Sequence, residues 1–192
     1  GNRANQFRLA GLELRAAPNS PQSWQKFTAR WIRPPYEVES FGVDLPRWRG
    51  PEDPARRLLV IQELEIGDQI YFAGFVARLA ALSLSGTLVC NPRLQTLFER
   101  SFPGWQCVGA LDEVTAENHD AQIMIGDLGQ TIRQSERPGY LLPMPDLVAR
   151  LRERYSGLAG GRALIGFTWR GGNDSSLDER RRHIPLSDFE RL

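Results

Sequence analysis

One carboxylate of this sequence stands where an enzyme could use it, in the Gly67-Asp68 pair that follows a short apolar run. The run, Leu58 to Ile61, has the length and composition of a buried strand, and the apolar segment after Asp68 is typical of a helix. Because ligands of open α/β sheets bind beyond the carboxyl ends of the strands, we expect Asp68 at the mouth of a cleft. There its carboxylate could act as a general base, or it could cap the helix that it begins. Gly67 would let the backbone approach a ligand or adopt a positive φ.

The elements that must position Asp68 are predicted from the spacing of apolar residues. Helices are expected within 6–17 and from Pro21 onward, with Ser20 as N-cap and Trp24, Phe27 and Trp31 on one face. Strands are then predicted at 58–61, 87–90, 105–108, 121–125 and 163–169. The helices between them are expected after Asp68, from Pro92 to Phe98, from about 128 to 133, and from Pro143 to Tyr155, ended by Gly157. This alternation predicts an α/β fold with a parallel, Rossmann-like, doubly wound sheet preceded by a short helical segment.

Composition narrows the possible functions. The 192 residues are 41% hydrophobic and 24% charged, which is typical of a globular protein, and the net charge of +1 gives little attraction to nucleic acid. No apolar run approaches the roughly 18 residues of a membrane span, and polar residues interrupt residues 1–17 where a signal peptide would be apolar, so we expect a cytoplasmic protein without a transmembrane segment. Phosphate-binding, dinucleotide-binding and nucleophile-elbow motifs are absent, and the two cysteines and two histidines lack metal-binding spacing. No metal or cofactor is therefore expected.

Four short blocks carry a resemblance to a known family. They are LPRWRG at 45–50, the strand and helix start from Leu58 to Ala73, Asp120 to Leu128 with Pro138 to Leu141, and Ile165 to Leu186. In this order they resemble bacterial tetratricopeptide-linked glycosyltransferases, which are similar to the ADP-heptose:lipopolysaccharide heptosyltransferases of glycosyltransferase family nine and to O-GlcNAc transferases. One departure is Glu65, a bulky anion where the family usually has a glycine, which could block or repel a phosphorylated acceptor.

The resemblance implies a GT-B architecture, in which a Rossmann-like domain faces the acceptor and a second domain binds a nucleotide-sugar donor. Residues 1–33 would be a tetratricopeptide-like tail, 34–56 an irregular connector, 57–160 the acceptor-side domain, and 161–192 the truncated start of the donor domain. The implied activity is transfer of a sugar from a nucleotide-sugar to a hydroxyl of a glycan, lipopolysaccharide or protein, without a metal. We expect the chain to be a fragment that is inactive alone.

The resemblance also implies roles for individual residues. Asp68 would be the catalytic base, with Gly67 and Gln69 beside it in contact with substrate. The groups that bind the donor and stabilise its leaving diphosphate would come from Trp169, Gly171, Asn173 and Arg182. The other interpretation of the loop from Arg170 to Arg182 is a solvated charged segment. Side chains expected to organise turns instead of doing chemistry are Asp120, Asp127 and His119.

An alternative from another functional class is a non-catalytic α/β binding or scaffold module, whose amino-terminal helices dock a protein partner. Glu65 favours this alternative, whereas Gly67-Asp68 and the block around Trp169 favour the enzyme.

Overall fold

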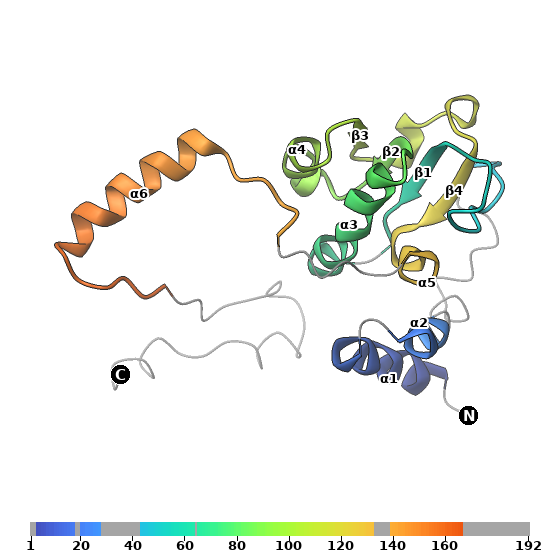
Figure 1. Cartoon of the computed structure of the whole chain (residues 1–192), viewed down its shortest axis with the longest axis horizontal. Helices are drawn as coiled ribbons and strands as arrows, with labels where there is room; N and C mark the ends of the chain where they lie inside the picture. Colours follow the sequence, from blue (N-terminus) through green and yellow to red (C-terminus); the bar gives the residue numbers. More distant parts are fainter. Residues whose placement is uncertain (1–2, 18–19, 28–42, 64, 133–138, 167–192) are drawn as a thin grey trace. The chain divides into compact units, whose positions relative to one another are not determined.

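The computed structural model describes residues 3–17, 20–27, 43–63, 65–132 and 139–166. The chain divides into two compact units, Gly1–Leu142 and Pro143–Leu192. The first unit contains the sheet and the helices around it, and the described part of the second contains helix α6 (Pro145–Ala159) (Figure 1).

The sheet consists of four parallel strands in the order β3-β2-β1-β4. They are β1 (Arg57–Ile61), β2 (Ser85–Val89), β3 (Trp105–Val108) and β4 (Ala121–Met124). In the register of the sheet, Val60 of β1 lies between Leu88 of β2 and Ile123 of β4. The order reverses between β1 and β4, and this reversal places a ligand-binding crevice beyond the carboxyl ends of these two strands in Rossmann-like folds. The predicted α/β, Rossmann-like fold is therefore confirmed.

Alternation along each strand separates two apolar layers. Leu58 and Val60 face a large core with helices α3 (Ile66–Ala81) and α4 (Pro92–Ser101), while Leu59 and Ile61 belong to a smaller cluster on the other face. That second face is packed by Leu111 and Val114, the first residue of the 3-10 turn η2 (Leu111–Glu113) and the residue directly after it, and a second turn, η3 (Ala116–Asn118), follows before β4. The return from β3 to β4 thus crosses the sheet without an α-helix. As predicted, Asn91 caps α4 and Pro92 is its first residue.

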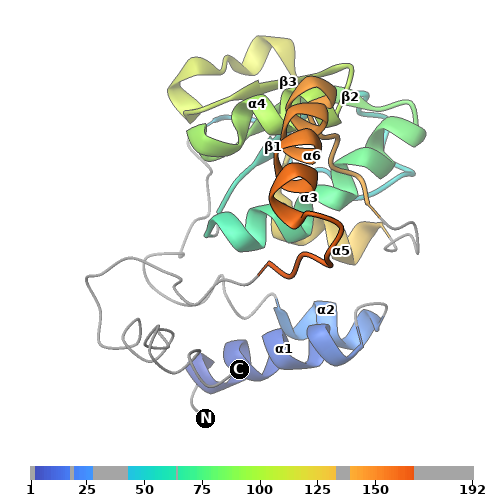
Figure 2. The same ribbon diagram turned by 90° about the vertical axis from the view of Figure 1, so that its left-hand side faces the viewer.

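The amino-terminal helices α1 (Arg3–Ala16) and α2 (Pro21–Phe27) form a hairpin, in which they lie side by side (Figure 2). Ser20 is the predicted cap, since its Oγ accepts a hydrogen bond from Ser23 N at 3.3 Å. Trp24 is buried, and its ring centroid lies 5.5 Å from that of Phe75 on α3. A Cβ on Gly129 would overlap the Trp24 indole, so this glycine lets the hairpin pack closely on α5 (Leu128–Thr131). The hairpin therefore shares the core of the sheet.

Several predicted boundaries differ from the structure by a few residues, such as the end of α4 at Ser101, and three further differences concern α3, α6 and the last predicted strand. Helix α3 begins at Ile66, with Glu65 at the N-cap position, so Gly67 and Asp68 lie inside its first turn and do not precede it. Ile66 packs against the core, which explains the earlier start. Helix α6 continues through Gly157, because a glycine inside a helix costs only about 1 kcal/mol, and ends at Gly160, which adopts a left-handed conformation with φ 54°.

The third difference concerns the strand predicted at 163–169. Residues 163–166 form no strand, and Ile165 is 87% exposed. An apolar run becomes a strand only where a neighbouring strand accepts its hydrogen bonds, and no strand of the described residues pairs with this segment. The rest of the predicted strand, 167–169, lies outside the described residues.

Candidate functional site

The exposed part of the site is the first turn of α3. Gly67 and Asp68 are both exposed, and a Cβ on Gly67 would meet no atom within 4 Å. Gly67 has a helical backbone, so the prediction that it could adopt a positive φ is wrong. Asp68 is not the N-cap either, because that position belongs to Glu65, whose side chain makes no capping hydrogen bond. An acidic group in the first turn is stabilised by the helix dipole, and the role of Asp68 as a base stays a prediction.

Gln69 is a buried residue that links the carboxyl ends of β1 and β2. Its side chain is buried, with Nε2 donating to Oε1 of Gln62 and Oε1 accepting from the backbone N of Asn91 at 2.9 Å. The amide therefore joins the segment after β1 to the segment after β2, next to the exposed Asp68. Direct contact between Gln69 and a ligand stays a prediction.

Tyr140 is a second contact that holds α3. Its hydroxyl donates to the carbonyl of Ile70, and its ring stacks on Phe102 with centroids 5.7 Å apart. A Cβ on Gly74 would come within 3.2 Å of the tyrosine ring, which explains the glycine there. Burial raises the pKa of Tyr140 to about 12, so the phenol remains a hydrogen-bond donor at neutral pH. The start of α3 is thus held both by Gln69 and by Tyr140.

The end of β4 carries a second group of charged residues. Glu63 Oε1 accepts a hydrogen bond from Gly126 N at 3.0 Å, which joins the segments after β1 and β4 at the reversal of strand order. Asp127 follows in the turn η4 (Ile125–Asp127), and its side chain is 2% exposed and paired with the Nη2 of Arg47. The guanidinium side chain of Arg47 is 53% exposed. The roles of Glu63 and Arg47 were not predicted from the sequence, in which Arg47 stands out only as part of the LPRWRG block.

The loop before β1 positions Arg47 by lying along β4. Trp48 N donates to Gln122 O at 2.8 Å, and Gln122 N donates to Pro46 O at 2.9 Å, which makes a parallel bridge. The Gln122 side-chain amide donates to the carbonyls of Val43 and Leu45. Trp48 is 1% exposed and fixes the loop to the core. Arg47, between these two anchored residues, can reach Asp127 from outside the sheet.

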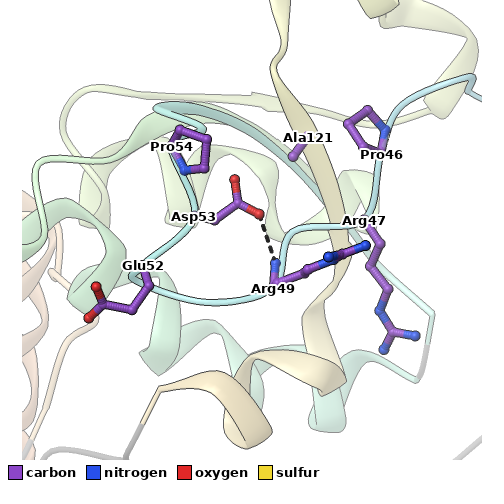
Figure 3. A pocket seen from close by; sticks show the side chains of 7 residues that line it. All are labelled: Pro46, Arg47, Arg49, Glu52, Asp53, Pro54 and Ala121. Carbon is purple, nitrogen blue, oxygen red and sulfur yellow. Dashed lines mark hydrogen bonds between the residues drawn. The ribbon is translucent and has the colours of Figure 1, made fainter.

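The same loop encloses a hollow of about 530 Å³. Asp53 organises it, because its carboxylate accepts from the backbone N of Arg49 at 3.2 Å and of Ala55 at 3.0 Å. Figure 3 shows the Arg47 guanidinium turned away from Asp53. The residues that line the hollow are Pro46, Arg47, Arg49, Glu52, Asp53, Pro54 and Ala121. Asp68 is not one of them, so the hollow and the carboxylate after β1 are separate features.

The side chains expected to organise turns do so. Asp120 accepts hydrogen bonds from the backbone N of Arg56 and Arg57 and from Arg57 Nη2, at 2.8–2.9 Å, and these bonds lower its pKa to about 2. His119 is buried, with Nδ1 3.0 Å from Thr115 O and Nε2 2.9 Å from Thr87 Oγ1. Because a carbonyl only accepts, Nδ1 carries the proton of this contact.

The cysteines belong to the core. Burial raises the pKa of Cys90 to about 11 and that of Cys107 to about 12, so both stay protonated at neutral pH. Among the described residues, no three histidine, cysteine or acidic side chains lie together as metal ligands would. None of the described helices is long and apolar enough to cross a membrane.

The residues expected on the donor side, Trp169, Gly171, Asn173 and Arg182, lie outside the described residues. Their roles stay predictions.

The chain therefore contains a Rossmann-like α/β domain, with polar side chains at the carboxyl ends of the strands where the strand order reverses. The chain matches no protein-family model and no solved structure. It is similar to Protein FlbA of Caulobacter vibrioides (strain ATCC 19089 / CIP 103742 / CB 15), with 25% identity over 171 residues. That match covers 78% of this chain and 28% of FlbA, so the chain spans less than a third of the length of this relative.

Proposed function

We propose that this chain is the acceptor-side domain of a glycosyltransferase that moves a sugar from a nucleotide-sugar to a hydroxyl group of a glycan, lipopolysaccharide or protein. The observation that carries the proposal is the exposed Asp68, in the first helical turn after the central strand β1. Its location fits the edge at which Rossmann-like folds bind ligands, and the four sequence blocks add the resemblance to glycosyltransferases.

In this mechanism the Asp68 carboxylate takes the proton of the acceptor hydroxyl. The freed oxygen forms the new bond to the anomeric carbon, and the bond from that carbon to the nucleotide diphosphate breaks, with the electron pair leaving on the diphosphate. A general base of this kind contributes roughly 10²–10⁴-fold to the rate. Trp169, Gly171, Asn173 and Arg182 would bind the donor and stabilise its departing charge.

The groups behind Asp68 would keep this edge rigid. Gln69 joins the ends of β1 and β2, and Glu63 joins the ends of β1 and β4. Holding a base within a fraction of an ångström of the productive geometry supplies a large part of enzymatic rate enhancement.

The test is sugar transfer by the full-length gene product, measured with a panel of nucleotide-sugars and cell-envelope acceptors. Asp68→Asn should lower the rate 10²–10⁴-fold and leave the unfolding midpoint within 1 °C of wild type. Glu117→Gln is the matched control, because Glu117 is an exposed carboxylate on η3, away from the first turn of α3. Near-normal transfer by Asp68→Asn would eliminate the proposed role of this carboxylate.

A second candidate function is the non-catalytic module, and one observation favours it. Leu9 and Leu12 on α1 are 52% and 61% exposed, although Ala10 and Leu14 of the same helix are buried. The apolar face of α2 is already used, since Trp24 and Phe27 pack inside this chain. A partner would therefore use α1. Partner binding that Leu9→Asp and Leu12→Asp abolish, together with no transfer from any nucleotide-sugar, would select the module.

A further inference from the structure

We propose that Tyr71 is the surface on which the acceptor sugar stacks, and that this sugar is an uncharged pyranose. The inference rests on the proposed function, because it specifies the ligand of the same edge. Tyr71 occurs one helical turn after Gly67 and Asp68, at spacings of four and three residues. Residues so spaced in a helix are neighbours, with Cβ atoms about 5–6 Å apart.

The surroundings of Tyr71 differ from those of the other aromatic residues on α3. Phe72 and Phe75 are buried in the core, whereas Tyr71 is 40% exposed. The Tyr71 ring also contacts Phe72 in an edge arrangement, with centroids 5.1 Å apart and an interplanar angle of 76°. A tyrosine side chain offers a large apolar area and loses little conformational entropy on binding. The exposed start of α3 therefore combines a carboxylate, a glycine and an aromatic ring.

This combination matches the chemistry of a sugar ring. One face of a pyranose carries mainly C–H groups, which pack on an aromatic ring, while its hydroxyls project from the rim as hydrogen-bond donors. A carboxylate such as Asp68 has about four acceptor positions, so it can receive a hydroxyl in addition to contacts within the protein. A pyranose lying on Tyr71 would bring a rim hydroxyl to the group proposed as base.

The charges at this edge argue against a phosphorylated sugar. Glu65 and Asp68 are both exposed at the start of α3, and the Glu65 side chain makes no capping hydrogen bond. Two carboxylates within one helical turn repel a phosphate and accept hydroxyl donors. Glu65, which departs from the family pattern, would thus act as a specificity residue.

The experiment is saturation-transfer-difference NMR on the full-length protein. The probes are the methyl pyranosides of glucose, galactose, mannose and N-acetylglucosamine. We expect the ring protons of at least one glycoside to give a saturation-transfer signal with the wild-type protein. This signal should be at least fivefold weaker with Tyr71→Ala and unchanged with Tyr71→Phe. Tyr155→Ala is the matched control, since Tyr155 on α6 is 47% exposed and should not affect the spectrum. Absence of any Tyr71-dependent saturation would overturn the inference.

Charge is tested with glucose 6-phosphate. It should give weaker saturation than methyl glucoside, and Glu65→Gln should reduce the difference. Stronger saturation of the phosphorylated sugar would overturn the uncharged ligand class.

The stacking role and the catalytic role can fail separately. Asp68→Asn should keep the Tyr71-dependent saturation while losing transfer. If Asp68→Asn transfers normally, the proposed base is wrong while stacking on Tyr71 stands. If Tyr71→Ala binds the glycosides like wild type, the stacking inference is wrong while the base stands.

Discussion

Gly67-Asp68 follows β1 and Gly126-Asp127 follows β4, so the same dipeptide occurs after two neighbouring strands of the sheet. Their environments are opposite. Asp68 is exposed in the first turn of α3, whereas the Asp127 side chain is 2% exposed and paired with Arg47. A buried carboxylate is stable only when it is paired, so Asp127 serves the fold, whereas the exposed position of Asp68 allows a ligand to approach it.

The segments between strand and dipeptide account for the difference. Four residues, 62–65, separate the end of β1 from α3, and they carry Gly67-Asp68 beyond the sheet onto an exposed helical turn. In contrast, η4 begins at Ile125, directly after β4, so the chain turns close to the loop before β1 that contains Arg47. Ile125 is fully buried, and Asp127 is buried beside it and paired with Arg47. Position relative to the strand end therefore decides which carboxylate reaches solvent.

Among the polar and charged side chains of the site, the largest effect on stability is expected from Arg47→Ala. It removes the Arg47 cation from the buried Asp127 carboxylate, and breaking a buried pair costs about 3–5 kcal/mol. Because half of Arg47 is exposed, we expect the lower end, about 3 kcal/mol, in urea unfolding. Arg49→Ala, an exposed arginine in the same loop, should change stability by less than about 0.5 kcal/mol. Equal midpoints for the two variants would show that Asp127 does not depend on Arg47.

A double variant sharpens this result. Adding Asp127→Asn to Arg47→Ala removes the buried negative charge as well as the cation and should recover part of the lost stability. No recovery would mean that Arg47 stabilises the loop by packing alone.

A smaller loss is expected from Gln69→Leu, next to Asp68. The apolar side chain fits the buried space but leaves Asn91 N and the Gln62 amide without these hydrogen bonds, at about 2 kcal/mol. Gln130→Leu, at an exposed position of α5, is the control and should be nearly neutral. Both can be measured by urea unfolding, and unchanged stability of Gln69→Leu would contradict the proposed internal bridge.

A third carboxylate, Asp120, extends the comparison to the other end of β4. Hydrogen bonds lower its pKa from 3.8 to about 2, so the folded state favours the ionised form. The stabilisation is fully present above about pH 4 and is lost as the pH falls from 4 toward 2. Urea unfolding of wild type between pH 7 and pH 2 should show this decline. Asp120→Asn should be less stable at pH 7 and lose less in that window, and an identical pH profile would contradict the assignment.

The sequence predicted the features that depend on local patterns. Buried apolar runs located β1, β3 and β4, and the residues Ser20 and Asn91 located two helix starts through their capping chemistry. Parallel pairing followed from the alternation of strands and helices. These features depend on residues close together in the chain, so a single sequence contains them.

The site was predictable only in part, because its contacts join distant segments. Arg47 and Asp127 are 80 residues apart, and Glu63 and Gly126 are 63 apart. No periodicity relates such pairs, and the pair of Arg47 and Asp127 also depends on the loop that lies along β4. For the same reason the sequence did not show that Asp68 is exposed and that Asp127 is buried.

The smallest change in stability is expected from Gly67→Ala, and its sign is favourable. A Cβ on Gly67 would meet open space, and alanine is preferred to glycine inside a helix by up to about 1 kcal/mol. Gly86→Ala is the contrasting control, since its Cβ would overlap the backbone of Leu58 at φ 148°, and it should unfold the protein. If a ligand approaches the backbone beside Asp68, Gly67→Ala should raise the unfolding midpoint and weaken sugar transfer at least tenfold. A variant that is more stable and fully active would show that no ligand needs the space over Gly67, because nothing in the described part of the chain fills it.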